Sequence, residues 1–166
     1  EGANLLSTLR LAGHVTDPTL IEREGRTYLF CNDRSAGSGV LNLWVSESLD
    51  GQFSLHPASP IRISPEGSRM GGGIIEHGDR LFRLGQDFSR GYGDGLVVFE
   101  IDELKPDTYS ERLIARIRFQ DRKGPHTLNV SGERIVFDWY RDRASPAAGL
   151  RRLVAFIQRR RPQATQ

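Results

Sequence analysis

Apolar and polar residues alternate along this chain in short runs that return at a fixed interval. Each return consists of an apolar run, a polar turn containing glycine and a second apolar run, which is the pattern of a β-hairpin. Arg26, Arg80 and Arg134 follow the turn in three such returns, and each lies 54 residues from the next. A hairpin that recurs about every 50 residues is typical of a β-propeller, in which each repeat forms one blade.

Three repeats account for nearly the whole chain of 166 residues. We therefore predict an all-β fold with three four-stranded propeller blades, at about residues 17–64, 71–117 and 126–144, in one partial β-propeller domain over residues 1–166. Propellers typically close with about four to eight blades, so three blades leave two open strand edges, which invite pairing with other chains. We expect either missing N-terminal blades of a longer ring or self-association through the open edges.

The chain after residue 144 follows a different pattern. Ser145 and Pro146 resemble a helix N-cap followed by proline at the first helical position, and apolar residues then recur at helical spacing as far as Ile157. These residues predict a C-terminal helix from about Pro146 to Arg160, within a basic segment that continues to residue 166.

Composition narrows the choice of partners, cofactors and compartment. The net charge is +2, and no basic face interleaved with aromatic residues is visible, so we expect no nucleic-acid partner. The single Cys31 excludes an internal disulfide and suits a reducing compartment, so we expect a cytoplasmic protein. His14, His56, His77 and His126 lack the spacing of metal ligands, so we expect no metal and no cofactor.

Polar residues gather where binding sites form in propellers. The first strand of each blade lines the central channel, and three polar side chains precede or begin these strands, namely Asp17, Arg69 and His126. The glycine-rich loop after the second strand of the second blade adds four more, namely Gln86, Asp87, Arg90 and Tyr92. Amide, carboxylate, guanidinium and phenol groups suit the hydroxyls and the ring face of a sugar. In the alternative interpretation, Asp87 and Arg90 pair with each other to hold a tight turn.

Asp17 immediately precedes Pro18 at the start of the first inner strand, where a carboxylate faces the channel. A general base in glycoside hydrolysis needs a second carboxyl group, about 6.5–9.5 Å away for inversion or about 5–5.5 Å for retention. The equivalent positions in the other repeats carry no carboxylate, and Glu66 and Asp87 are the nearby candidates. The other role open to Asp17 is to cap the turn before the strand.

Several segments resemble known propeller families. The segment from Asp17 to Phe30 resembles inner-blade segments of the family 43 glycoside hydrolases and related five-bladed propellers. A second resemblance, over about residues 15–140, is to the glucosamine inositolphosphorylceramide transferase N-terminal-like family. It is carried by Arg69, Glu76-His77, Gln86-Asp87, Ser89-Arg90, Tyr92-Gly93 and the His-Thr-Leu-Asn sequence that starts at His126. This resemblance implies that the three blades are the last three of five.

The same resemblance implies a role beside a transferase domain, because the propeller accompanies such domains in this family. The sequence departs from the family pattern at Met70, at Phe88 and at the glycines of residues 71–73. We therefore expect a carbohydrate-binding or carbohydrate-processing propeller that is accessory to a sugar-modifying transferase. The alternative is a glycoside hydrolase of the family 43-like type with Asp17 as general base. A second channel carboxylate would distinguish the two functions.

Overall fold

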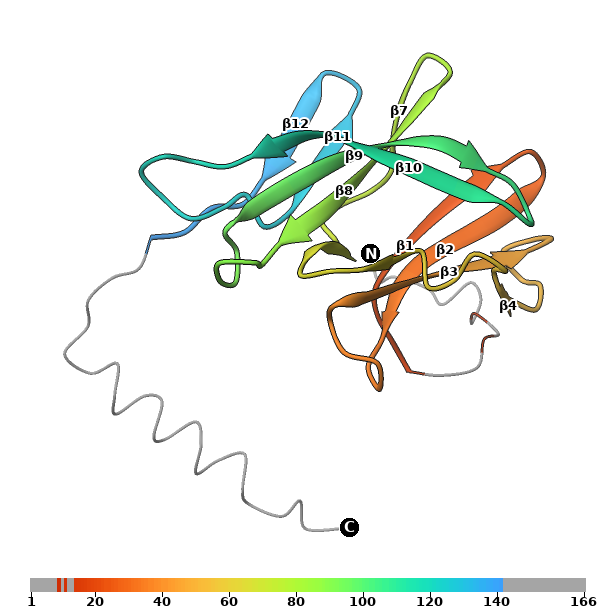
Figure 1. The fold of residues 1–166 in the computed structure, drawn as a ribbon. Coiled ribbons are helices and arrows are strands. Elements are labelled where there is room, and N and C mark those ends of the chain that lie inside the picture. The colour runs from red at the N-terminus through yellow and green to blue at the C-terminus, as the bar shows by residue number, and fades with distance from the viewer. Residues whose placement is uncertain (1–8, 10, 12–13, 142–166) are drawn as a thin grey trace, which may run out of the picture.

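A computed structural model of the protein describes residues 9, 11 and 14–141. Within this range every regular element is a β-strand, and the strands form three antiparallel sheets (Figure 1). The predicted all-β class is confirmed. The predicted helix from Pro146 to Arg160 lies outside the described residues. In the described part of the chain there is no helix of the length and hydropathy needed to cross a membrane.

The first sheet follows the order of the chain. Its strands are β1 (Val15–Arg23), β2 (Arg26–Asp33), β3 (Val40–Ser46) and β4 (Ser54–Leu55), and β5 (Arg62–Ile63) pairs with the N-terminal end of β3. Glu24 and Gly25 form the turn between β1 and β2, and both have positive φ. A type I′ hairpin turn requires positive φ at both of its central positions.

The second sheet repeats this arrangement with its first strand in two pieces. Its strands are β6 (Glu66–Met70), β7 (Ile75–His77), β8 (Arg80–Asp87), β9 (Gly95–Leu104) and β10 (Tyr109–Ile117). Strand β6 pairs with the C-terminal half of β8, and β7 pairs with its N-terminal half. The segment of three glycines at residues 71–73 separates the two pieces.

The third sheet is the hairpin of β11 (Leu128–Ser131) and β12 (Arg134–Phe137). In all three sheets the arginine that marks the repeat is the first residue after the turn and pairs with the last residue of the preceding strand. The three predicted hairpins are therefore present at the predicted interval of 54 residues. The third blade was predicted to have four strands at about residues 126–144, but residues 126–141 form only the two strands β11 and β12.

The first strands of the three repeats meet at one place. The backbone amide of Leu128 in β11 donates to the carbonyl oxygen of Gly71 at 2.8 Å. The hydroxyl of Thr19 in β1 donates to the carbonyl oxygen of Gly72 at 3.4 Å. The glycine segment between β6 and β7 thus touches both neighbouring sheets, and this meeting of strands positions the candidate site.

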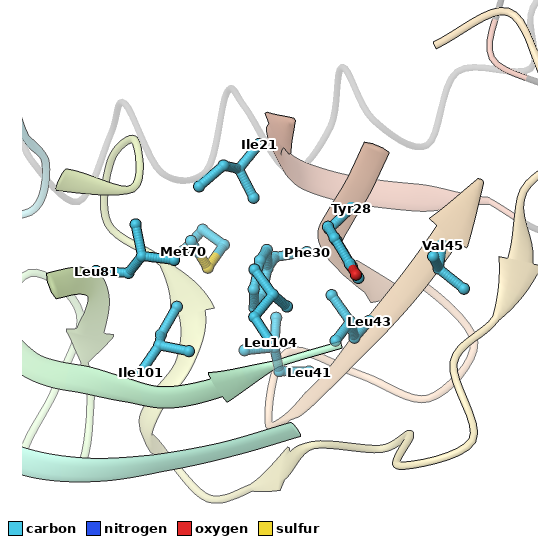
Figure 2. Packing of buried hydrophobic residues seen from close by; sticks show 10 residues of the cluster. All are labelled: Ile21, Tyr28, Phe30, Leu41, Leu43, Val45, Met70, Leu81, Ile101 and Leu104. Carbon is cyan, nitrogen blue, oxygen red and sulfur yellow. The ribbon is translucent and has the colours of Figure 1, made fainter. Parts of the chain in front are cut away.

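The main core fills the space between the first and second sheets (Figure 2). Alternate residues of β3 point into it, as the period-two pattern of the sequence indicates. The buried side chains of this core are Ile21, Tyr28, Phe30, Leu41, Leu43, Val45, Met70, Leu81, Ile101 and Leu104. Strand β2 is buried on both faces, because a smaller cluster of Leu29, Cys31 and Phe53 covers its other side.

A buried cluster of charged groups joins the same two sheets. The guanidinium of Arg83, which is fully buried, donates two hydrogen bonds of 2.6 Å to the carboxylate of Glu111. The phenol of Tyr109 donates to the same carboxylate at 2.6 Å, and Arg62 from β5 approaches it at 3.5 Å. The guanidinium groups of Arg62 and Arg83 lie 4.2 and 4.4 Å from the centre of the Phe99 ring.

Candidate functional site

An open hollow of about 440 Å³ lies where the first strands of the three repeats meet. Its walls come from all three sheets and include two sets of residues at equivalent positions of the repeat. These sets are Pro18, Gly72 and His126, and Thr19, Gly73 and Thr127. Asp17, Leu20, Met70, Gln86 and Asn129 complete the lining. The structure therefore brings three of the predicted site residues, namely Asp17, Gln86 and His126, to one hollow.

Asp17 lies in a bulge of β1. The register against β2 shifts by one residue between Thr16 and Thr19, and Asp17 has a φ of 52°. A non-glycine residue in this region is strained, and such strain is concentrated at functional sites. The carboxylate oxygen Oδ2 of Asp17 accepts a hydrogen bond of 2.7 Å from Nε of Arg69 and lies 2.6 Å from an Nη of the same guanidinium. This ion pair at the edge of the hollow links the first sheet to the second.

His126 is held by Asp138, a residue that the sequence analysis did not single out. The backbone amides of His126 and Thr127 both donate to Asp138 Oδ1 at 2.7 Å, and His126 Nδ1 lies 3.6 Å from Asp138 Oδ2. Burial tends to raise the pKa of the Asp138 carboxyl, but the two amide donors and His126 outweigh this effect, so the pKa lies below its usual value. The hairpin register could have predicted this contact, since it places Asp138 across from Thr127.

Gln86 and Asp87 are buried at the end of β8 with internal partners. The amide nitrogen of Gln86 donates to the carbonyl oxygen of Met70 at 2.8 Å. One carboxylate oxygen of Asp87 accepts from the backbone amide and the hydroxyl of Ser89, at 3.0 and 2.6 Å, and the other pairs with Arg118. Burial tends to raise the pKa of Asp87, but the Ser89 and Arg118 contacts outweigh it and hold the pKa below its usual value.

Arg90 and Tyr92 lie further out. Arg90 is exposed and pairs with Asp94 at 2.7 Å, so the alternative pairing of Arg90 with Asp87 is wrong. It lines a separate hollow of about 500 Å³, together with residues of the chain between the second and third sheets. Tyr92 is 61% exposed, and one part of its ring packs against the imidazole of His126 with ring centres 4.7 Å apart. Tyr92 thus contacts a residue that lines the first hollow, whereas Arg90 lines the second.

Among the described residues, Asp17 is the one carboxylate that lines the hollow. Glu66 pairs with Arg116 at 2.7 Å, Asp87 pairs with Arg118, and neither lines the hollow that contains Asp17. Within residues 14–141 there is also no group of three or more potential metal ligands. The residues that line the hollow can therefore offer hydrogen bonds to a ligand, and Asp17 with its partner Arg69 offers an ion pair.

Replacing Asp87 by asparagine is expected to lower the free energy of unfolding by about 1–2 kcal/mol at neutral pH, because Arg118 loses the nearer of its two ionic partners and keeps Asp94 at 3.7 Å. The pKa of Asp87 is lowered in the folded state, so this contribution is present above the unfolded pKa of about 3.9 and is lost as the pH falls through the folded pKa. Urea unfolding at neutral and acidic pH measures the difference, which should shrink in acid. Asp50→Asn, at an exposed loop position, is the control and should have little effect at either pH.

The matching family model and the similar proteins carry the same name. The family described as glucosamine inositolphosphorylceramide transferase 1, N-terminal, matches residues 5–136, which include every residue that lines the hollow. The chain is 29% identical to glucosamine inositolphosphorylceramide transferase 1 of Arabidopsis thaliana over 69% of its own length, and 32% identical to the protein of the same name from Oryza sativa subsp. japonica over 57%.

The chain spans a small part of these relatives, 16% of the Arabidopsis protein and 14% of the rice protein. No solved structure shows a significant match. The family match covers most of the chain and all three sheets. The chain therefore belongs to the family of the N-terminal region of glucosamine inositolphosphorylceramide transferase 1.

Proposed function

We propose that this domain binds carbohydrate in the hollow between its first strands, as an accessory to a sugar-modifying transferase. The observation that carries the proposal is the gathering of Asp17, Gln86 and His126 from three sheets around one open hollow. The names of the relatives describe a transferase of glucosamine, and the match is to the N-terminal part of that transferase. This placement supports a transferase domain as the partner of the domain described here.

The chemistry of the hollow suits a polyhydroxylated ligand. Binding sites for small molecules hold a few placed polar groups that fix orientation. The Asp17–Arg69 ion pair provides a carboxylate acceptor and guanidinium donors whose positions are fixed by each other. Tyr92 presents an exposed aromatic ring against His126 in the wall of the hollow, and an aromatic face can pack against the C–H face of a sugar.

We further propose that the three sheets are successive blades of a five-bladed type of propeller. The support is the interval of 54 residues, together with the contact of equivalent first strands around the hollow. Equivalent strands surround a common axis in a propeller. In this arrangement the outer faces of the first and third sheets are where preceding blades, a transferase domain or a second copy would attach.

Calorimetric titration with glucosamine, N-acetylglucosamine and myo-inositol tests the binding function. We expect at least one of these compounds to bind. Asp17→Asn should weaken that binding about 10- to 100-fold, because a hydrogen bond to a charged group contributes about 1.5–3 kcal/mol. Asp33→Asn is the matched control, because Asp33 is an aspartate at the same end of the β1–β2 pair with a local Ser35 partner and lies outside the hollow. Equal binding by the wild type and both variants would rule out this site.

The strained backbone at Asp17 favours a second candidate function, the family 43-like glycoside hydrolase with Asp17 as general base. This reaction requires a second carboxyl group at a defined distance, and among the described residues no carboxylate besides Asp17 lines the hollow. Assays with aryl glycosides separate the two functions. Hydrolysis that is lost in Asp17→Asn and kept in Asp33→Asn would favour the hydrolase over the binding domain.

A further inference from the structure

One nitrogen in the wall of the hollow is buried without a partner. Nε2 of His126 is shielded from solvent and makes no hydrogen bond with any of the described residues. An unpaired buried polar atom costs about 1–3 kcal/mol, so most such atoms in native proteins have a partner or a function. The position of His126 in the lining of the candidate site suggests that the partner of Nε2 is a ligand group.

The other nitrogen of the same ring faces a carboxylate. Nδ1 of His126 lies 3.6 Å from Oδ2 of Asp138, a carboxyl whose pKa is lowered and which is therefore ionised at neutral pH. An ionised carboxylate offers acceptors and no donor, so its charge favours the imidazole tautomer that carries hydrogen on Nδ1. In this tautomer Nε2 has a free lone pair and is an acceptor.

The imidazole is also held in place by its surroundings. Asp138 Oδ1 accepts the backbone amides of His126 and Thr127, which fixes the start of β11 relative to the end of β12. The ring of Tyr92 packs against the imidazole with an angle of 47° between the two planes, and the hydroxyl of Tyr140 donates to the carbonyl oxygen of Tyr92. A binding group fixed in this way loses little freedom when the ligand arrives.

We propose that Asp138 is a positioning residue that keeps His126 in the Nδ1–H tautomer, so that Nε2 accepts a hydrogen bond from a hydroxyl of the bound carbohydrate. This inference rests on the proposed function and adds the acceptor and the residue that orients it. A sugar hydroxyl is a suitable donor because it can rotate its hydrogen toward a lone pair. Because Nε2 is shielded from solvent in this structure, the proposal requires the side chains around the imidazole to move when the ligand binds.

The tautomer can be measured without any ligand. In a protein labelled with ¹⁵N-histidine, the nitrogen chemical shifts distinguish a protonated from an unprotonated ring nitrogen. We expect His126 to show the Nδ1–H form in the wild type, and Asp138→Asn to reduce that preference. The asparagine oxygen can still accept the two backbone amides, so the variant is expected to fold.

His56 provides an internal control in the same spectrum. Its Nδ1 accepts a hydrogen bond from the amide of Ala58 at 3.1 Å, so its proton is on Nε2, which lies 2.8 Å from the carbonyl oxygen of Lys105. We therefore expect His56 to show the opposite tautomer, unchanged by Asp138→Asn. An Nε2–H form of His126 in the wild type, or no change in Asp138→Asn, would overturn the role of Asp138.

The acceptor role is tested by titrating the labelled protein with glucosamine, N-acetylglucosamine and myo-inositol. We expect the compound that binds to shift the Nε2 resonance of His126 and leave that of the exposed His77 unchanged. Asp138→Asn should weaken the binding about 3- to 10-fold, whereas Asp121→Asn, an exposed carboxylate outside the hollow, should not. Binding without a shift at His126 would overturn the inference and leave the proposed function standing. Absence of binding by all three compounds would overturn the proposed function, and the acceptor role with it.

Discussion

Replacing Glu111 by glutamine is expected to lower the free energy of unfolding by about 3–5 kcal/mol, because the substitution leaves a buried guanidinium without a counter-charge. Arg83 is fully buried and its ionic partner is Glu111. Burial by itself disfavours the charged form of Arg83, but the hydrogen bonds and the charge of Glu111 outweigh burial and keep the pKa of Arg83 above its usual value. In the variant an amide nitrogen would face guanidinium donors in place of a carboxylate oxygen.

Chemical denaturation of the wild type and Glu111→Gln measures this loss. Glu103→Gln is the matched control, because Glu103 pairs with Lys105 at the surface with the same N–O distance of 2.6 Å. An exposed pair of this kind contributes about 0–1 kcal/mol. Equal losses in the two variants would show that water reaches Arg83. The double variant Arg83→Met with Glu111→Met should recover part of the stability, since replacing both ions of a buried pair removes the uncompensated charge.

The repeat in the sequence predicted the parts of the fold that depend on local pattern. Each hairpin has its own turn glycine and its own pair of apolar runs, so its register can be predicted without knowledge of the rest of the chain. Gly25, Gly78 and Gly132 all have the positive φ that their turns require. The split of the first strand of the second sheet was not predicted, since the glycines that interrupt it are compatible with either a loop or a strand.

The contacts between sheets could not be predicted from the local pattern. Asp87 was predicted to bind a ligand or to pair with Arg90, three residues away, and its ionic partner is Arg118 in the chain after β10. The pairing of Asp17 with Arg69 was also not predicted, although both residues were expected at the same site. Charged residues are numerous in this sequence, so the choice of partner depends on how the sheets pack.

The position of Asp138 could have been predicted from the hairpin pairing. Asp138 follows β12 directly, and the hairpin register places it across from Thr127, the residue before β11. A carboxylate at that position can accept the free amides at the beginning of the strand. Extending the hairpin pairing by one residue on each side would have placed Asp138 across from Thr127, the neighbour of His126, and the same step can be applied to other hairpins of this family.

The glycine segment that joins the three sheets leads to the second large expected effect. Gly72→Ala is expected to lower the free energy of unfolding by roughly 3–4 kcal/mol, the combined cost of overpacking and of a strained backbone. Gly72 has a φ of 150°, and a Cβ atom at this position would lie 1.9 Å from the carbonyl oxygen of Leu128. This oxygen belongs to the backbone of β11, so the clash can be relieved only by moving the third sheet away from the second.

Hydrogen exchange shows which part of the structure the substitution destabilises. The amide of Leu128, which donates to Gly71, should lose its protection in Gly72→Ala, while amides of β2 and β3 keep theirs. Gly73→Ala is the matched control, because the nearest atom to its Cβ would be Asn129 Oδ1 at 3.7 Å, an ordinary contact. The loss in the free energy of unfolding would then differ by several kcal/mol between alanine substitutions at two adjacent glycines. If instead both variants kept the Leu128 amide protected, β11 would not rest on the glycine segment, and the hollow formed there would lose its third wall.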